Sequence, residues 1–142
     1  MSFGQAASRG SHLRHVDDAA LCPCGSGDSY GGCCGPLLRG GSAPTAERLM
    51  RSRYTAFFVG DANYLAESWH PRTRPDSVEV DHPLRWTGLD ITDTEGGGPA
   101  DATGVVEFTA WWIESGARGE LHEPSRFVRQ SGRWWYLDGD VG

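Results

Sequence analysis

The chain has 142 residues, 38% hydrophobic and 23% charged, which suits one folded domain with a small additional module and excludes a disordered composition. Its formal net charge is −6, so we do not expect general nucleic-acid binding, because phosphate affinity requires a concentrated positive surface. No apolar run is long enough to cross a membrane, and residues 1–20 lack the apolar stretch of a signal peptide. We therefore expect a cytoplasmic protein without a membrane partner.

Residues 1–20 show no periodic apolar pattern and are predicted to be a disordered tail. Residues 21–40 form a small module that contains every cysteine of the chain, in the segment CPCGSGDSYGGCC. Four thiolates can surround one zinc ion tetrahedrally, and the glycines between the two cysteine pairs permit the tight turn that this requires. The sequence therefore predicts one structural Zn2+ per chain, with the ligands Cys22, Cys24, Cys33 and Cys34.

Two other interpretations of the cysteines stay open. Cys33 and Cys34 could act as a redox pair, or the thiols could simply be buried. A catalytic zinc is disfavoured, because four thiolate ligands leave no coordination position for water.

The segment after a short Gly40-Gly41 hinge predicts a helix that is capped by Thr45 and stopped by Gly60. Its apolar stripe comprises Leu49, Met50, Tyr54, Phe57 and Phe58. Arg53 falls inside this stripe, whereas the scattered arginines Arg48 and Arg51 are expected on the solvated face. Asp61 is predicted to cap a second helix over residues 62–70, which Pro71 ends.

Beyond residue 80 the pattern changes to strands over residues 84–92, 103–115, 119–130 and 133–139, which are rich in aromatic and β-branched residues. Ser131-Gly132 predicts a hairpin turn before the last strand. Two helices followed by antiparallel strands indicate an α+β domain over residues 41–142.

An arginine in an apolar stripe needs a partner inside the fold, because an unpaired buried charge is costly. Glu123 and Ser125 alternate onto one face of their strand, so Glu123 is predicted to form a bidentate ion pair with Arg53. His122 points to the opposite face and is not paired with Glu123. The interior around this pair is predicted to be lined by some of Tyr54, Trp69, Trp86 and Trp112. The pair is either an internal salt bridge or part of a pocket for a small molecule, with Glu123 as a possible base; no catalytic residue is assigned.

The spacing Cys-x-Cys-x8-Cys-Cys resembles the SEC-C motif, and the segments LMRSRYTAFFVGDANYLAESWHP, RWTGL, VEFTAWW, EPSRF and WWYLDG resemble the YchJ family in order and spacing. This resemblance implies a small N-terminal zinc knuckle joined to a domain of the nuclear-transport-factor-two-like fold. In that α+β cone, helices pack into a curved antiparallel sheet around a pocket. Some family members carry a second SEC-C motif at the C-terminus, which this sequence lacks. The family brings no established activity.

Two functions follow as hypotheses. The first is a non-enzymatic interaction protein that docks through its knuckle onto another protein or a ribosomal surface, since SEC-C modules in secretion-linked proteins contact the chaperone SecB or ribosomes. The second is a small-molecule binder or cofactor-independent enzyme that uses the pocket of the α+β domain. A homodimer through the outer face of the sheet is also possible on the sequence, through Val105, Glu107, Thr109, Trp111 and Ile113.

Overall fold

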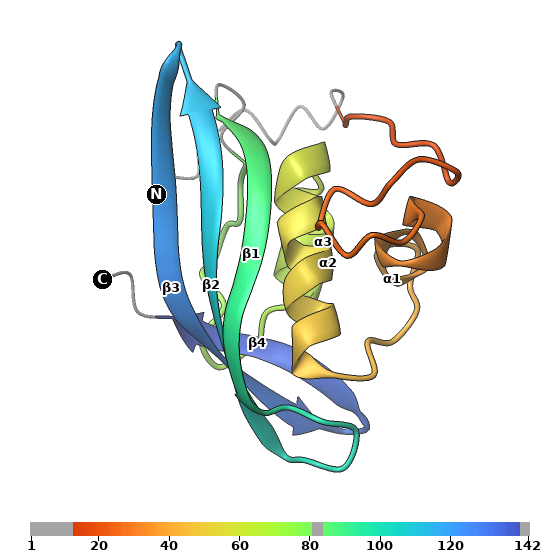
Figure 1. Ribbon diagram of the computed structural model, residues 1–142. Coiled ribbons are helices and arrows are strands. Elements are labelled where there is room, and N and C mark those ends of the chain that lie inside the picture. Colours follow the sequence, from red (N-terminus) through yellow and green to blue (C-terminus); the bar gives the residue numbers. More distant parts are fainter. Residues whose placement is uncertain (1–12, 81–83, 140–142) are drawn as a thin grey trace.

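The computed structural model describes residues 13–80 and 84–139, and its helices precede its strands as the sequence predicts (Figure 1). Its elements are the 3-10 helix η2 (Tyr30–Gly32), the α-helices α1 (Cys34–Leu38), α2 (Ala46–Val59) and α3 (Ala62–Glu67), and the strands β1 (Arg85–Gly96), β2 (Thr103–Glu114), β3 (Ala117–Gln130) and β4 (Arg133–Gly139). Among the described residues, no helix has the length and apolar character that a bilayer crossing requires.

The four strands form one sheet in the order β1-β2-β3-β4, with every neighbouring pair antiparallel. The predicted turn at Ser131-Gly132 is confirmed, with φ angles of 54° and 77°. Ser115 and Gly116 make a second such turn between β2 and β3, with φ angles of 51° and 82°. Two consecutive residues with positive φ match the twist of a tight hairpin, so both connections keep the strands in register.

Helix α2 stands between the sheet on one side and the cysteine module on the other, as Figure 1 shows. The predicted ends of this helix are confirmed: the Thr45 hydroxyl accepts the backbone N–H of Arg48 at 3.1 Å, and Gly60 adopts a left-handed conformation with φ of 87°. Leu49, Met50 and Tyr54 are buried in one core cluster that also contains the sheet residues Trp86, Val106, Phe108, Ala110, Phe127 and Trp134.

Helix α3 is shorter than the sequence predicted. The Asp61 side chain caps its start by accepting the backbone N–H of Tyr64 at 3.0 Å, but the helix ends at Glu67 rather than His70. The reason lies in β4: the backbone N–H of Tyr136 donates to Ser68 O at 2.9 Å, and that of His70 donates to Tyr136 O at 2.8 Å. These two hydrogen bonds draw the chain out of the helix and onto the edge of the sheet.

The predicted disordered tail falls partly within the described residues. Residues 1–12 lie outside them. The backbone N–H of Arg14 donates to Val59 O at 2.9 Å, and that of Gly31 donates to Asp18 O at 2.9 Å. Residues after 12 thus contact both α2 and the cysteine module.

All four tyrosines of the chain have pKa values above their ordinary value, with burial as the first cause; for Tyr136 the pKa rises to about 12. Since the pKa of an unfolded tyrosine is about 10, the neutral phenols contribute stability that is complete below that pH and is lost as the pH rises toward the folded-state values. We expect tyrosinate absorbance to stay low just above pH 10 and to appear together with loss of the circular dichroism of the fold. A chain unfolded in denaturant is the control and should titrate near pH 10. A normal tyrosine titration with the fold intact would contradict the burial of these rings.

Candidate functional site

The cysteine module is a short hairpin followed by two small helices. Leu21 and Ser29 form an antiparallel bridge, and the backbone N–H of Cys22 donates to Asp28 O at 2.9 Å. Gly25 and Gly27 have φ angles of 79° and 91°, a conformation that side-chain-bearing residues rarely adopt. The hairpin returns the chain so that η2 and the start of α1 bring Cys33 and Cys34 back to the first cysteine pair.

The four cysteine side chains are buried and converge on one point, with all four Sγ atoms within 4.8 Å of one another. Cys24 Sγ and Cys33 Sγ lie 3.7 Å apart, and Cys33 Sγ and Cys34 Sγ lie 3.9 Å apart. A tetrahedral metal with bonds to sulfur of about 2.3 Å has sulfur–sulfur edges of about 3.8 Å. The residues predicted as ligands are therefore arranged as a tetrathiolate metal site requires. This confirms that the cysteines form one cluster able to hold a metal.

The sulfur atoms also shift one another's ionisation. The hydrogen bond with Cys22 is the main cause that lowers the pKa of Cys24, and the same contact is the main cause that raises the pKa of Cys22. Hydrogen bonds with Cys22 and Cys24 raise the pKa of Cys34. A negative charge held at one sulfur therefore opposes ionisation of its neighbours. A bound cation removes this conflict, because it stabilises all four thiolates together.

Helix α2 holds the module through a polar stripe that the sequence analysis placed in solvent. Arg51 Nη1 donates to Cys24 O at 2.9 Å, and Arg48 Nη2 donates to Cys33 O at 3.2 Å. Thr55 Oγ1 lies 3.8 Å from Cys22 Sγ. The prediction that these arginines form the solvated face is wrong, because the cysteine module covers that side of α2. Their helical spacing with Thr55 was the signal that could have revealed the contact.

A cavity of about 180 Å3 lies on the other side of α2, against the sheet. Of the residues predicted to share the domain interior, six line this cavity: Arg53, Tyr54, Trp69, Trp86, Glu123 and Ser125. Trp112 does not line it; its ring packs against Trp86 with a centroid distance of 5.7 Å. Tyr136 of β4 also lines the cavity and was not anticipated.

The predicted bidentate ion pair between Arg53 and Glu123 is wrong: within the described part of the chain, no ion pair joins them. Arg53 Nη1 instead donates to Leu65 O at 2.8 Å and to Ser68 Oγ at 2.6 Å. Leu65 O belongs to the last turn of α3, where the helix dipole favours a cation, so this helix end replaces the carboxylate that we expected. Glu123 Oε2 accepts a hydrogen bond from Ser125 Oγ at 2.7 Å.

The outer face of the sheet carries residues that the alternating pattern of the strands predicted for it. His122 lies opposite the cavity, as predicted, and its ring nitrogens contact Glu107 Oε2 at 2.7 Å and Thr109 Oγ1 at 3.0 Å. Trp111 on the same face is 37% exposed. This face therefore carries both polar and apolar side chains.

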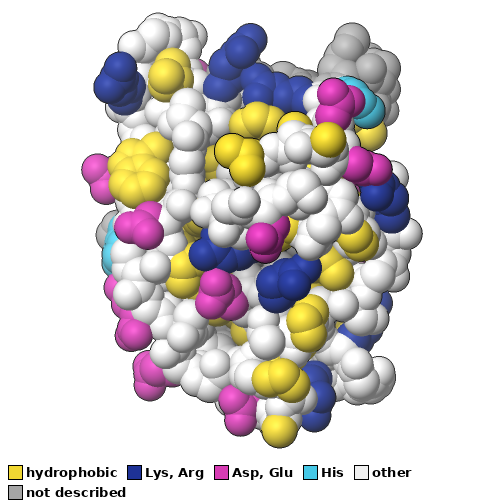
Figure 2. Space-filling model, turned by 45° about the vertical axis from the view of Figure 1, so that its right-hand side comes forward, with side chains coloured by type: hydrophobic (Ala, Val, Ile, Leu, Met, Phe, Trp, Pro, Cys, Tyr) yellow, Lys and Arg dark blue, Asp and Glu magenta, His cyan; other side chains and the backbone are white. Residues whose placement is uncertain are grey.

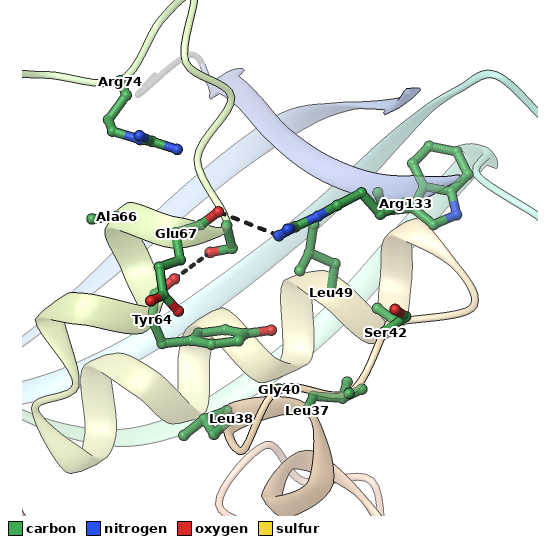
Figure 3. Close-up of a pocket in the computed structure, with 14 residues that line it drawn as sticks. Leu37, Leu38, Gly40, Ser42, Leu49, Tyr64, Ala66, Glu67, Arg74 and Arg133 are labelled. Carbon is green, nitrogen blue, oxygen red and sulfur yellow. Dashed lines mark hydrogen bonds between the residues drawn. The ribbon is translucent and has the colours of Figure 1, made fainter. Parts of the chain in front are cut away.

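A wider hollow of about 520 Å3 lies where α1 and the loop after it face α3 and β4 (Figure 3). Figure 3 shows Arg74 and Arg133 on the opposite side of it from Leu37 and Leu38. Both arginines donate to backbone carbonyls: Arg74 Nη2 to Trp69 O at 2.8 Å and Arg133 Nη2 to Glu67 O at 3.3 Å. These cations stabilise the chain around α3.

The contact between α2 and the cysteine module gives a prediction for stability. Replacing Arg51 by Met should lower the free energy of unfolding by about 1–3 kcal/mol, because the Cys24 carbonyl loses a charged hydrogen-bond donor. Arg85→Met on the exposed surface of β1 is the control and should change stability by less than about 0.5 kcal/mol. Both values come from denaturant unfolding of the metal-loaded protein. Equal stability of the two variants would show that the contact does not hold the module.

The comparison with known proteins agrees with the division of the chain into a cysteine module and an α+β domain. A family model described as YchJ, middle NTF2-like domain, matches residues 45–139. A UPF0225 protein of Streptomyces coelicolor is 53% identical over 120 residues, which cover 84% of this chain and 94% of the relative. A second UPF0225 protein, from Chromobacterium violaceum, is 45% identical over 127 residues, covering 86% and 93% of the two chains.

Two solved structures share the fold. A SEC-C motif containing protein from Rhodopseudomonas palustris matches with a TM-score of 0.73 at 35% identity, covering 85% of this chain and 98% of that one. A sec-c motif containing protein from Psychrobacter arcticus matches with a TM-score of 0.71 at 25% identity, covering 88% and 84%. The α+β fold and the resemblance inferred from the sequence are confirmed, and the chain belongs to the YchJ (UPF0225) family.

Proposed function

We propose that the four cysteines hold one structural Zn2+ and that the knuckle they close, residues 21–40, is a docking module for another protein. The observation that carries this proposal is the convergence of four buried Sγ atoms within 4.8 Å. Four thiolates complete a tetrahedral shell and leave no position for water or substrate. The metal then fixes the shape of the knuckle rather than taking part in a reaction.

Zinc is the metal that fits this donor set best, because soft thiolates in a tetrahedral arrangement select zinc or iron. Zinc contributes about 10–16 kcal/mol of apparent binding free energy to small modules that have no adequate core. We expect a native mass spectrum to show one zinc per chain and Cys33→Ser to lose it. Iron at the same stoichiometry, or no metal in freshly purified protein, would contradict the assignment.

The surface of the knuckle has features of a docking site. Leu21 is 75% exposed although it directly precedes a metal ligand and pairs with Ser29 in the hairpin. Because the arginines of α2 hold the knuckle backbone, this side chain is presented on a rigid support, which lowers the entropy lost on binding. Figure 2, which turns this side of the molecule forward, shows charges of both signs among apolar side chains. Such a surface favours a protein partner over the phosphates of a nucleic acid.

Ribosomes and the chaperone SecB are the partners to test first, because SEC-C modules of secretion-linked proteins contact them. We expect the protein to co-sediment with ribosomes or bind SecB, and Leu21→Ser to weaken that binding at least about tenfold while zinc stays bound. Trp111→Ser is a matched control, since it removes an exposed apolar side chain from the outer face of the sheet. Equal losses in both variants, or no binding to either partner, would contradict docking through the knuckle. Comparing the oligomeric state of the parent protein and Trp111→Ser also tests the homodimer that the sequence suggested through the outer face of the sheet.

A further inference from the structure

The cavity between α2 and the sheet contains two buried charges of opposite sign that do not neutralise each other directly. Arg53 is 4% exposed and Glu123 is 8% exposed, and both line this space of about 180 Å3. Buried ions in folded proteins are normally paired in direct contact, because desolvation is costly. A cation and a carboxylate that face the same cavity without an ion pair therefore need an explanation.

The guanidinium of Arg53 is held by hydrogen bonds at one nitrogen, and its other two nitrogens can donate to a ligand. Its Nη1 atom donates to Leu65 O and Ser68 Oγ. Its Cζ atom lies over the rings of Tyr136 and Trp69, at 4.2 Å and 5.2 Å from their centroids. Within the described residues, Nε and Nη2 have no hydrogen-bond partner. Burial lowers the pKa of Arg53 to about 10, so the side chain remains a cation at neutral pH. Two neighbouring N–H donors of a guanidinium are the geometry that binds a carboxylate.

Glu123 is fixed in the same way, with one oxygen used. Its Oε2 atom accepts the Ser125 hydroxyl at 2.7 Å, while Oε1 accepts no hydrogen bond from the described part of the chain. The carboxylate lies against Gly139 of β4, where an added Cβ would come within 2.0 Å of Oε2. The glycine therefore leaves the space that the carboxylate occupies. A free carboxylate oxygen in an apolar cavity is suited to an ammonium group.

The remaining walls are apolar. Phe57 comes from α2, Trp86 from β1, Phe108 from β2 and Leu121 from β3. The volume is below the range of about 300–1,000 Å3 that is typical of pockets for drug-sized ligands. The cavity thus suits a small molecule with an apolar part and two charged ends.

We propose that this cavity binds a small zwitterion of the amino-acid class, with its carboxylate on Arg53, its ammonium on Glu123 and its apolar side chain against Trp86 and Phe108. A simple anion would meet the repulsion of Glu123, and a simple amine would meet that of Arg53. A zwitterion satisfies both charges and needs no metal, so this site is independent of the zinc knuckle.

The test uses two matched sets of probes with the full-length, metal-loaded protein. Leucine is compared with 4-methylpentanoate and 3-methylbutylamine, and phenylalanine with 3-phenylpropionate and phenethylamine, so each set removes one charge at a time. Calorimetry should show that at least one of the two amino acids binds, and that its two analogues bind at least about tenfold more weakly.

Variants identify the site. Glu123→Gln keeps the shape of the side chain and should weaken binding of the amino acid at least about tenfold, while leaving binding of the carboxylate analogue unchanged or improved. Arg53→Met should abolish binding of both. Glu120→Gln, on the outer face of the same strand, is the matched control and should bind as the parent does.

Three results would overturn the proposal. Neither amino acid binds at millimolar concentration, the carboxylate analogue binds as tightly as its amino acid, or Glu123→Gln binds the amino acid unchanged. If Arg53→Met fails to fold, the comparison of Glu123→Gln with Glu120→Gln still decides the outcome. Absence of binding, together with a lower stability of Glu123→Gln, would make the two charges a structural feature of the core.

Discussion

Helix α2 is buried on two sides, and both parts of the molecule are built on it. Its apolar side, with Leu49, Met50 and Tyr54, lies against the sheet, while Arg48 and Arg51 hold the cysteine knuckle. A helix of 14 residues is only marginally stable in isolation, so it depends on these contacts as much as they depend on it. The four cysteines belong to the same core cluster as Tyr54 and Trp86. Knuckle and domain therefore share one hydrophobic core across the Gly40-Gly41 segment.

Guanidinium groups make this double burial possible. Arg48, Arg51 and Arg53 all donate to main-chain carbonyls, and Arg51 adds an ion pair with Glu47 at 3.0 Å. A planar group with five donors can satisfy several carbonyls at once and can stack on aromatic rings, which an ammonium group does less well. On these two faces of α2, the arginines thus make the packing contacts that apolar side chains make in most protein cores. The cost is the desolvation that lowers the pKa of Arg53.

The features that sequence analysis predicted correctly depend on local chemistry. Thr45, Gly60 and Asp61 begin and end helices through their own side chains or backbone angles, and Ser131-Gly132 forms a turn within two residues. The clustering of the four cysteines could likewise be predicted, because all four lie in one short segment. Alternation along β3 correctly placed Glu123 and Ser125 on the inner face and His122 on the outer one.

The features that were missed depend on contacts between distant segments. Arg48 and Arg51 were predicted to be solvated because their spacing with Thr55 shows a polar stripe on the helix but does not identify the knuckle that covers it. The end of α3 is set by hydrogen bonds with Tyr136 in β4, and the partner of Arg53 is a carbonyl of that same helix end. Periodicity identifies which side of an element is covered, but the covering group is known only once the chain is folded.

The hydrogen bonds from Arg48 and Arg51 end on the main-chain oxygens of Cys33 and Cys24, not on side chains. Every amino acid supplies that oxygen, so the attachment of the knuckle places no demand on the identity of most residues between the cysteines. Substitution there is restricted at the cysteines, at the left-handed positions Gly25 and Gly27, and at Gly31, where an added Cβ would come within 2.7 Å of the Asp18 side chain. The buried ring of Tyr30 is a further restriction. The exposed surface of the knuckle can therefore diverge between lineages, and acquire different binding preferences, while its attachment to α2 stays the same.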